Sequence, residues 1–390
     1  MSGTAEMMKK DNRTTSYEGP HKAGDSQGTD AAGRRKGRTF APGRMLALLA
    51  AAAGIPLLVC AALVVWIDPF FHYHRPLSWF PYQVDHQLSQ NPGMARHMDY
   101  DSIITGSSMT VNFDTDDFRD LLGLNALKLS YDGATPKDIS NILSIVYDED
   151  NPERQRSDVR QAFIAIDILS YTADPDETKY PIPEYLYNRN PFDDVNYLFN
   201  KDVLLDYIVA PAAGHKDRTD LSFVYGMTWL TPDLLGEDYV KAHYSPAPKS
   251  AERVPDDLFL EGTDRNLKTN ILPYIKAHPE TEFTFFFPPV SILFWNDFVN
   301  ENSLDARLLQ CEDIGETLLS CPNVRVFFFM DEKDVVEDLD YYTDTVHFTP
   351  EISTRMVQCF RSGQDEVSAG GMKRVLQHMR ELVMNYLFDS

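Results

Sequence analysis

The chain has few of the residues that build disulfide frameworks or metal sites. Its 390 residues include four cysteines, Cys60, Cys311, Cys321 and Cys359, and Cys60 lies inside a long apolar run. The odd number that remains argues against a disulfide framework. A Cys311–Cys321 bridge and three buried free thiols both stay open. Neither a CxxC nor an HExxH pattern occurs, so the sequence supports no metal site.

Positive charge is scarce outside the N-terminal segment. Residues 1–44 contain 9 Lys/Arg against 5 Asp/Glu, a net +4, whereas residues 45–390 contain 27 against 54, a net −27. Nucleic acids attract cationic surfaces, so this acidic body excludes DNA and RNA as partners. Residues 1–44 also hold few large apolar side chains and many Gly, Ser and Thr, which predicts a disordered tail.

One segment carries no charge at all. Residues 45–67 read MLALLAAAAGIPLLVCAALVVWI, and a helix of that length crosses a hydrocarbon core of about 30 Å. Five Lys/Arg residues between positions 34 and 44 precede it, and Asp68 is the first charge after it. The positive-inside rule therefore predicts a single-pass membrane protein with a cytoplasmic N-terminus and residues 68–390 outside the cytoplasm.

A cleaved signal peptide is the alternative interpretation of this run. Such peptides have an apolar region of about 7–15 residues followed by a small-residue cleavage site. Here the run is longer and ends in VVWI without an A-x-A pattern. The sequence therefore favours a retained transmembrane helix.

Beyond a juxtamembrane connector at 68–98, short apolar segments alternate with helix-like segments. The segments rich in Ile, Val and Phe are typical of strands buried on both faces. Their alternation with helices predicts an α/β domain over residues 99–390, with a doubly wound parallel sheet. The candidate strands are 102–105, 126–130, 162–169, 282–287 and 323–329, and the candidate helices are 115–122, 136–147, 266–277, 303–319, 371–387 and one that begins at 349–350.

A long segment at about 170–264 interrupts this alternation. It is dense in Asp, Pro, Tyr and Asn, as in YLYNRNPFDDVN at 185–196. Long insertions between strands commonly act as lids or substrate platforms. A solvated excursion that only covers the edge of the sheet is an equally good interpretation.

The first candidate strand ends in a turn that contains two serines. Residues 103–110 read IITGSSMT, so Gly106, Ser107 and Ser108 follow the strand directly. Ligands of doubly wound sheets bind beyond the carboxyl ends of the strands, and a serine there needs an adjacent base to become a nucleophile. Taken alone, Gly-Ser-Ser is more typical of a plain turn.

Two further turns contain residues that such a serine would need. In DTVHFTP at 344–350, Asp344 stands three residues before His347, a spacing that lets the carboxylate orient the imidazole as a base. In LSYDGAT at 129–135, Gly133 follows the second strand, where a backbone N–H can face a developing oxyanion. Each pattern is weak alone, because a loop histidine near an aspartate and a turn glycine are both common.

The order of these motifs resembles that of the SGNH (GDSL-type) hydrolase family over residues 99–362. Gly-Ser-Ser-Met-Thr at 106–110 resembles the family's first block, Gly-Asp-Ser-Leu-Thr, with Ser107 in place of Asp. Gly133 matches the glycine of the second block. Asp344 and His347 match the last block. The resemblance implies a serine hydrolase with no metal or organic cofactor.

The resemblance also implies a role for each residue. Ser108 would be the nucleophile, His347 the general base and then acid, and Asp344 the residue that orients His347. The N–H groups of Ser108 and Gly133 would form the oxyanion hole. The third block of the family has Gly-x-Asn, whereas this chain has Ala165-Ile166-Asp167. An ionised Asp167 cannot donate a hydrogen bond to an oxyanion, so its part in the hole is in doubt.

The layout as a whole resembles membrane-anchored SGNH-like proteins of bacterial envelopes, a group that includes the teichoic-acid D-alanylation protein. This resemblance implies an esterase or O-acyltransferase that acts on an acylated cell-wall or surface polysaccharide, alongside other membrane-bound envelope enzymes. The alternative is a catalytically degenerate domain that binds an envelope glycan or a partner protein. Asp167 and the acidic insertion are the features that favour this alternative.

Overall fold

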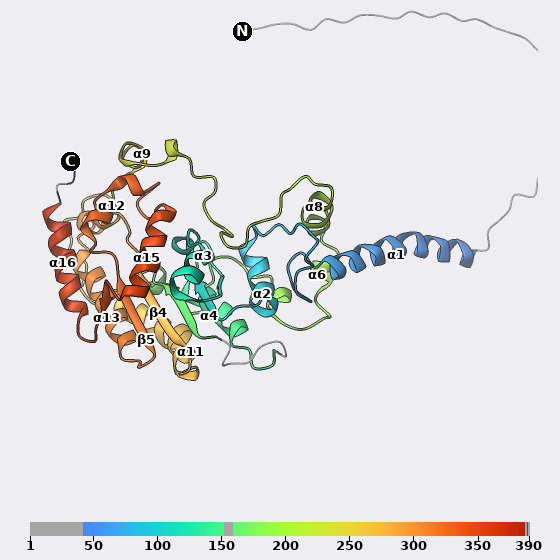
Figure 1. Cartoon of the computed structure of the whole chain (residues 1–390), viewed down its shortest axis with the longest axis horizontal. Coiled ribbons are helices and arrows are strands. Elements are labelled where there is room, and N and C mark those ends of the chain that lie inside the picture. Colours follow the sequence, from blue (N-terminus) through green and yellow to red (C-terminus); the bar gives the residue numbers. More distant parts are fainter. Residues whose placement is uncertain (1–41, 152–158, 387, 389–390) are drawn as a thin grey trace, which may run out of the picture. The chain divides into compact units, whose positions relative to one another are not determined.

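The computed structural model of the chain describes residues 42–151, 159–386 and 388 (Figure 1). The chain forms two compact units, residues 1–54 and 55–390. The second unit contains the sheet and every candidate catalytic residue. The predicted disordered tail at 1–44 lies almost wholly outside the described residues.

The charge-free segment forms a single helix, α1 (Pro42–Ile67), drawn in blue in Figure 1. It begins three residues before the predicted start, with Pro42 at its first position, where the missing N–H costs nothing. Its most apolar window has a mean hydropathy of 2.6, and within the described part of the chain it is the one helix long and apolar enough to cross a membrane. The predicted orientation across the membrane stays a prediction.

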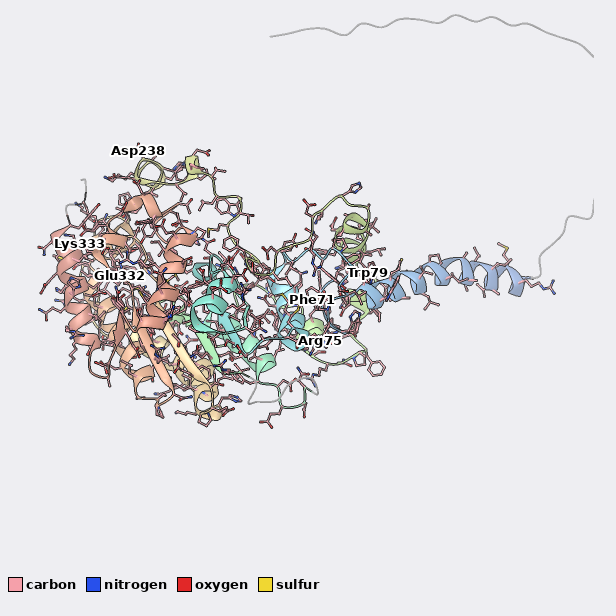
Figure 2. The ribbon with its side chains drawn as sticks, viewed as in Figure 1. Phe71, Arg75, Trp79, Asp238, Glu332 and Lys333 are labelled. Carbon is pink, nitrogen blue, oxygen red and sulfur yellow. The ribbon has the colours of Figure 1, made fainter. Side chains whose placement is uncertain are left out.

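Asp68 fixes the chain just after this helix. Its buried carboxylate accepts the backbone N–H groups of residues 72–74 at 2.7–2.9 Å and the hydroxyl of Tyr197, from the insertion, at 2.9 Å. Burial raises the pKa of Asp68, and these hydrogen bonds oppose the rise. Nearby, the rings of Trp66 and Trp79 lie 5.9 Å apart (Trp79 is labelled in Figure 2). The juxtamembrane connector is thus tied to the insertion.

A six-stranded sheet forms the centre of the second unit. Its strand order is β2-β1-β3-β4-β5-β6. The first five strands are parallel, and β6 pairs antiparallel with β5. The strands are β1 (Ser102–Thr105), β2 (Ala126–Lys128), β3 (Gln161–Ala165), β4 (Glu282–Phe287), β5 (Val324–Phe328) and β6 (Glu366–Val367).

The predicted α/β fold with a parallel sheet is confirmed by these strands. The order 2-1-3-4-5 is that of flavodoxin-like sheets, in which ligands bind where the strand order reverses. The two-residue strand β6 was not predicted, because it is too short to show an alternating pattern. The finer prediction of a doubly wound SGNH domain stays a prediction.

Most predicted helices form close to their expected bounds. The helix predicted at 266–277 begins earlier, because α10 (Leu260–Asn266) continues through a π-helical segment, Leu267–Ile271, into α11 (Leu272–Ala277). At the start of α4 (Pro136–Val146), Thr135 and Asp138 form a capping box. Figure 1 shows the later helices, in orange and red, gathered with β4 and β5. The other helices of the sheet domain are α2 (Gln87–His97), α3 (Thr115–Asp117), α12 (Ile292–Asn300), α13 (Leu304–Leu319), α14 (Lys333–Val336), α15 (Pro350–Ser362) and α16 (Met372–Asn385).

A few buried side chains anchor the insertion to the core, whereas most of its residues are exposed or half-buried. The buried apolar side chains are at most 2% exposed and include Tyr197, Val203, Val224 and Val240. The insertion carries five short helices, α5 (Glu184–Tyr187), α6 (Val195–Leu198), α7 (Lys201–Leu204), α8 (Ala210–Ala212) and α9 (Glu237–His243). By burial alone, a substrate platform and a solvated excursion both stay open.

The cysteines form no bridge. All four are free, and Cys311, Cys321 and Cys359 are buried. Of the two alternatives that the sequence left open, the structure therefore contains the buried free thiols. Burial raises the pKa of Cys311 to about 12, which keeps this thiol protonated and unreactive at neutral pH.

Candidate active site

The turn after β1 places Ser108 at the carboxyl end of the sheet. Gly106 has a φ of +150°, and a Cβ at this position would lie 2.8 Å from the Cβ of Ala165 on β3. Only glycine allows so close an approach of the two strands. Ser108 then opens a 3₁₀ turn, Ser108–Thr110, closed by the Thr110 N–H on the carbonyl of Ser107 at 3.0 Å. The side chain of Ser108 is half-buried.

The loop that carries His347 is held from two sides. Residues Tyr342 and Phe348 form an antiparallel bridge across it. The N–H and the hydroxyl of Ser291, just after β4, donate to the carbonyl of Thr345 at 3.0 and 2.9 Å. Since β4 and β1 belong to one parallel sheet, this tether brings the histidine loop to the same edge as the serine turn.

The structure brings Ser108, His347 and Asp344 together in a chain of hydrogen bonds. Ser108 Oγ lies 2.6 Å from Nε2 of His347. Nδ1 of His347 lies 2.6 Å from Oδ2 of Asp344. The other carboxylate oxygen, Oδ1, accepts the backbone N–H groups of Val346 and His347, both at 2.7 Å. The three-residue spacing between Asp344 and His347 allows this contact, because the loop turns the Asp344 carboxylate back toward the backbone N–H groups that follow it.

The charges around His347 favour its protonated form. Burial lowers the pKa of His347, but the hydrogen bond and charge of Asp344, with the charges of Asp132 and Asp167, raise that pKa above its ordinary value overall. Burial likewise acts to raise the pKa of Asp344, but its bonds to His347 hold that pKa below the usual value. This pattern suits an imidazole that must accept a proton and an aspartate that must stay ionised.

Two backbone N–H groups remain for an oxyanion. Among the described residues, neither the N–H of Ser108 nor that of Gly133 donates a hydrogen bond. Gly133 has a φ of +70°, and a Cβ there would lie 2.8 Å from Cε of Lys179. A side chain at this position would therefore be both strained and crowded.

Asp167 follows β3 but takes no part in the chain of hydrogen bonds. Its carboxylate accepts the N–H of Leu169 at 3.2 Å. Burial raises the pKa of Asp167, against the opposing effects of the N–H groups of Leu169 and Ser170 and of the charge of His347. Asp167 thus acts on His347 through its field, and the structure supplies no evidence for it as an oxyanion donor.

The insertion forms one wall of the cavity above Ser108. This cavity has a volume of about 550 Å³. Its wall contains five insertion residues that sequence reasoning did not single out, although the insertion itself was a candidate substrate platform: Tyr225, Met227, Trp229, Tyr239 and His243. The cavity is large enough for a small acylated unit.

Asn112 is another residue near the site that the sequence analysis did not identify. Its Nδ2 donates to the carbonyl of Phe348 at 2.8 Å, and its Oδ1 accepts the N–H of Met227 at 2.9 Å. The side chain is buried, with 3% exposed. Asn112 therefore joins the serine turn, the histidine loop and the insertion. No sequence motif distinguishes it from other loop asparagines.

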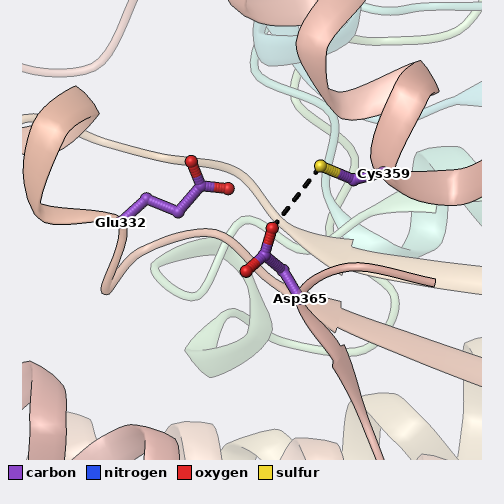
Figure 3. A group of neighbouring side chains, drawn as sticks. All are labelled: Glu332, Cys359 and Asp365. Atoms are coloured by element: carbon purple, nitrogen blue, oxygen red, sulfur yellow. Dashed lines mark hydrogen bonds between the residues drawn. The ribbon is translucent and has the colours of Figure 1, made fainter. Parts of the chain in front are cut away.

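Away from the cavity above Ser108, the described part of the chain contains one group of potential metal ligands. It comprises Glu332, Cys359 and Asp365, whose ligand atoms lie within 4.8 Å of one another (Figure 3). The thiol of Cys359 donates to Asp365 at 3.4 Å. A guanidinium nitrogen of Arg355 lies 2.5 Å from Glu332. Because this cation already pairs with the cluster, the geometry does not favour a metal there.

No known protein-family model matches this sequence, and no curated protein matches it. One solved structure to which the chain has a distant similarity is described as "a putative platelet activating factor from Streptococcus pneumonia". It shares 12% identity and a TM-score of 0.37, over 71% of this chain and 90% of that one. So distant a likeness carries no argument about family or substrate.

Proposed function

We propose that this chain is a membrane-tethered serine esterase or O-acyltransferase of the SGNH type, with a doubly wound catalytic domain outside the cytoplasm. Its substrate would be an acylated polysaccharide of the cell envelope. One observation carries the proposal: Ser108, His347 and Asp344 form a continuous chain of short hydrogen bonds at the carboxyl edge of a parallel sheet. This chain is what the enzyme interpretation requires and a degenerate binding domain does not.

The proposed reaction begins when Ser108 Oγ attacks the acyl carbonyl while Nε2 of His347 accepts the hydroxyl proton. The carboxylate of Asp344 stabilises the imidazolium that results. The N–H groups of Ser108 and Gly133 donate to the oxyanion of the tetrahedral intermediate. When the intermediate collapses, His347 returns the proton to the departing alcohol oxygen. An acyl-Ser108 intermediate remains.

Water or a hydroxyl group of a second molecule then resolves the acyl-enzyme. His347 removes a proton from this incoming group as its oxygen attacks the acyl carbonyl. When the second tetrahedral intermediate collapses, the bond between the acyl carbon and Ser108 Oγ breaks, and His347 returns the proton to Ser108 Oγ. Hydrolysis and transfer differ only in the group that attacks. Exclusion of water by the insertion wall would favour transfer.

A fluorophosphonate probe tests the proposal directly, because it labels only serines activated as nucleophiles. We expect the full chain in detergent micelles to be labelled, and Ser108→Ala to abolish the label. Ser107→Ala is the matched control and should keep the label, since Ser107 is the adjacent buried serine and its Oγ has no hydrogen-bond partner among the described residues. A folded wild-type chain that takes up no label would refute the enzyme interpretation and favour the alternative of a binding domain.

A further inference from the structure

A groove adjoins the cavity above Ser108. It has a volume of about 960 Å³ and is open to solvent. The groove and the cavity share three lining residues, Asp132, Tyr225 and Trp229. Whatever binds in the groove therefore lies next to Ser108 and His347, and a molecule bound across both would present one of its units to the serine.

Aromatic side chains in the groove offer flat, accessible faces. Trp229 and Tyr180 line it and are 57% and 53% exposed. Exposed large aromatic rings cost free energy in water unless a ligand covers them. Faces of this kind suit the C–H faces of sugar rings.

The polar groups of the groove are mostly hydrogen-bond acceptors. Asp85, Asp132 and Asp220 line it, and each has its Oδ1 engaged by the protein, by Tyr207, Gln87 and Ser222 respectively. Among the described residues, no partner occupies the Oδ2 atom of any of the three. Three carboxylate oxygens are thus left to accept hydrogen bonds from a ligand.

None of the described residues that line the groove is Lys or Arg. Lys179 approaches the Tyr180 ring, 5.9 Å from its centroid, without lining the groove. With three carboxylates and no lining cation, the groove repels phosphate and carboxylate groups. A polyanionic chain is therefore a poor ligand for this surface.

A hydroxyl in the groove separates sugars from simple cations as ligands. Thr228 lines the groove and is exposed, and none of the described residues hydrogen-bonds to its hydroxyl. This hydroxyl can donate as well as accept a hydrogen bond. An ammonium group offers no acceptor, whereas a sugar hydroxyl both donates and accepts.

We infer that the groove binds an uncharged, hydroxyl-rich glycan chain and places its acyl ester next to Ser108. The inference rests on the proposed function and narrows its substrate. Trp229 and Tyr180 stack on sugar rings, the three aspartates accept hydrogen bonds from sugar hydroxyls, and Thr228 donates to a sugar oxygen. Polymers with phosphate or carboxylate in every repeat are excluded by charge.

The test measures binding, so it does not depend on catalysis. The full-length Ser108→Ala chain, in a detergent without a sugar head group, is titrated by calorimetry with matched hexasaccharides. Maltohexaose and the N-acetylglucosamine hexamer are the neutral probes, and the hyaluronan hexasaccharide is the anionic probe. We expect at least one neutral probe to bind in the millimolar range or tighter, and the anionic probe to bind more weakly than that neutral probe.

Three variants connect the binding to the groove. Trp229→Ala should weaken binding of the neutral probe about tenfold, the change that corresponds to 1.4 kcal/mol. Thr228→Val should weaken it less, because only one hydrogen bond is lost. Trp79→Ala is the matched control, since Trp79 is 61% exposed but lies outside the groove, and it should leave binding unchanged.

The possible results divide cleanly. Any one of three results would overturn the inference. Neither neutral probe binds, hyaluronan binds more tightly than the neutral probes, or Trp229→Ala binds the neutral probe as tightly as the chain that keeps Trp229. Binding as expected together with a wild-type chain that takes up no fluorophosphonate would refute the proposed enzyme function and leave a glycan-binding groove. The two tests therefore distinguish an error in the inference about the groove from an error in the proposed enzyme function.

Discussion

Ser108 Oγ lies 2.6 Å from Nε2 of His347, although 239 residues separate the two in the sequence. The serine follows the first strand and the histidine precedes α15, so the contact exists only when the parallel sheet has formed. The tether of Ser291 to Thr345 completes it by holding the histidine loop to the end of β4.

Asp344→Asn should abolish most of the esterase activity without unfolding the chain. An asparagine at position 344 can still accept the N–H groups of Val346 and His347, but it has no charge to stabilise the imidazolium. In serine hydrolases of known mechanism such a change lowers kcat roughly 10⁴-fold. Initial rates with p-nitrophenyl acetate measure this, and circular dichroism verifies the fold. A loss smaller than tenfold would contradict the assigned role of Asp344.

Activity should fall at acidic pH because His347 must be neutral to accept a proton. The pKa of His347 is raised above its ordinary value of about 6.5, since Asp344, Asp132 and Asp167 together outweigh burial. Protonation of His347 as the pH falls through that pKa removes the base. A plot of kcat/KM against pH should therefore bend above about 6.5. A profile that is flat down to pH 5 would exclude His347 as the base.

Asp167→Asn should move this bend toward lower pH and should not reduce kcat. The substitution removes a negative charge that raises the pKa of His347. It also introduces an amide, which the SGNH family has at the corresponding place after its third strand, and an amide can donate to an oxyanion where a carboxylate cannot. The same pH profile measures both effects. A fall in kcat would show that the carboxylate itself is required.

Asn112→Ala should lower both stability and activity. It leaves the buried carbonyl of Phe348 and the N–H of Met227 without their partner, at a cost of about 1–3 kcal/mol for each unsatisfied group. Asn112→Asp keeps the acceptor for Met227 but loses the donor to Phe348, so it isolates the effect on the histidine loop. Thermal unfolding and kcat are measured for both variants. If neither variant changes kcat, the asparagine does not position His347.

Lys128 should make stability depend on pH in the mildly alkaline range. It is fully buried, and burial lowers its pKa to about 7 although Nζ donates to the carbonyls of Val111 and Phe113 at 2.5 and 2.6 Å. In the unfolded chain this lysine keeps its proton up to about pH 10.4. Folding between pH 7 and that value therefore releases a proton, so the free energy of unfolding rises as the pH rises through this range. The slope is about 1.4 kcal/mol per pH unit.

Lys128→Met isolates that effect. Urea unfolding of the full chain in detergent micelles is compared between wild type and variant from pH 7.5 to 8.5. Unfolded cysteines begin to ionise in this range, but their contribution is the same in both proteins and cancels in the comparison. The free energy of unfolding should rise over this interval by about 1 kcal/mol more in wild type than in the variant. Parallel curves for the two proteins would show that Lys128 keeps its proton when buried.

The local elements of this protein could be predicted from the sequence. The charge-free run had to form an apolar helix, and the runs rich in Ile, Val and Phe had to be buried strands. The positions of Ser108, Asp344 and His347 at strand ends and before α15 followed from the same patterns. The resemblance to one hydrolase family then joined the three, and no single motif carried that step.

Other features were decided by tertiary contacts alone. The insertion wall, the bridge through Asn112, the buried amine of Lys128 and the groove beside the cavity depend on side chains from distant segments meeting at one place. Hydrophobic periodicity encodes which face of an element is buried, because that depends on neighbouring residues. It does not encode which loops meet above the sheet, because loop positions are fixed by contacts across long sequence separations.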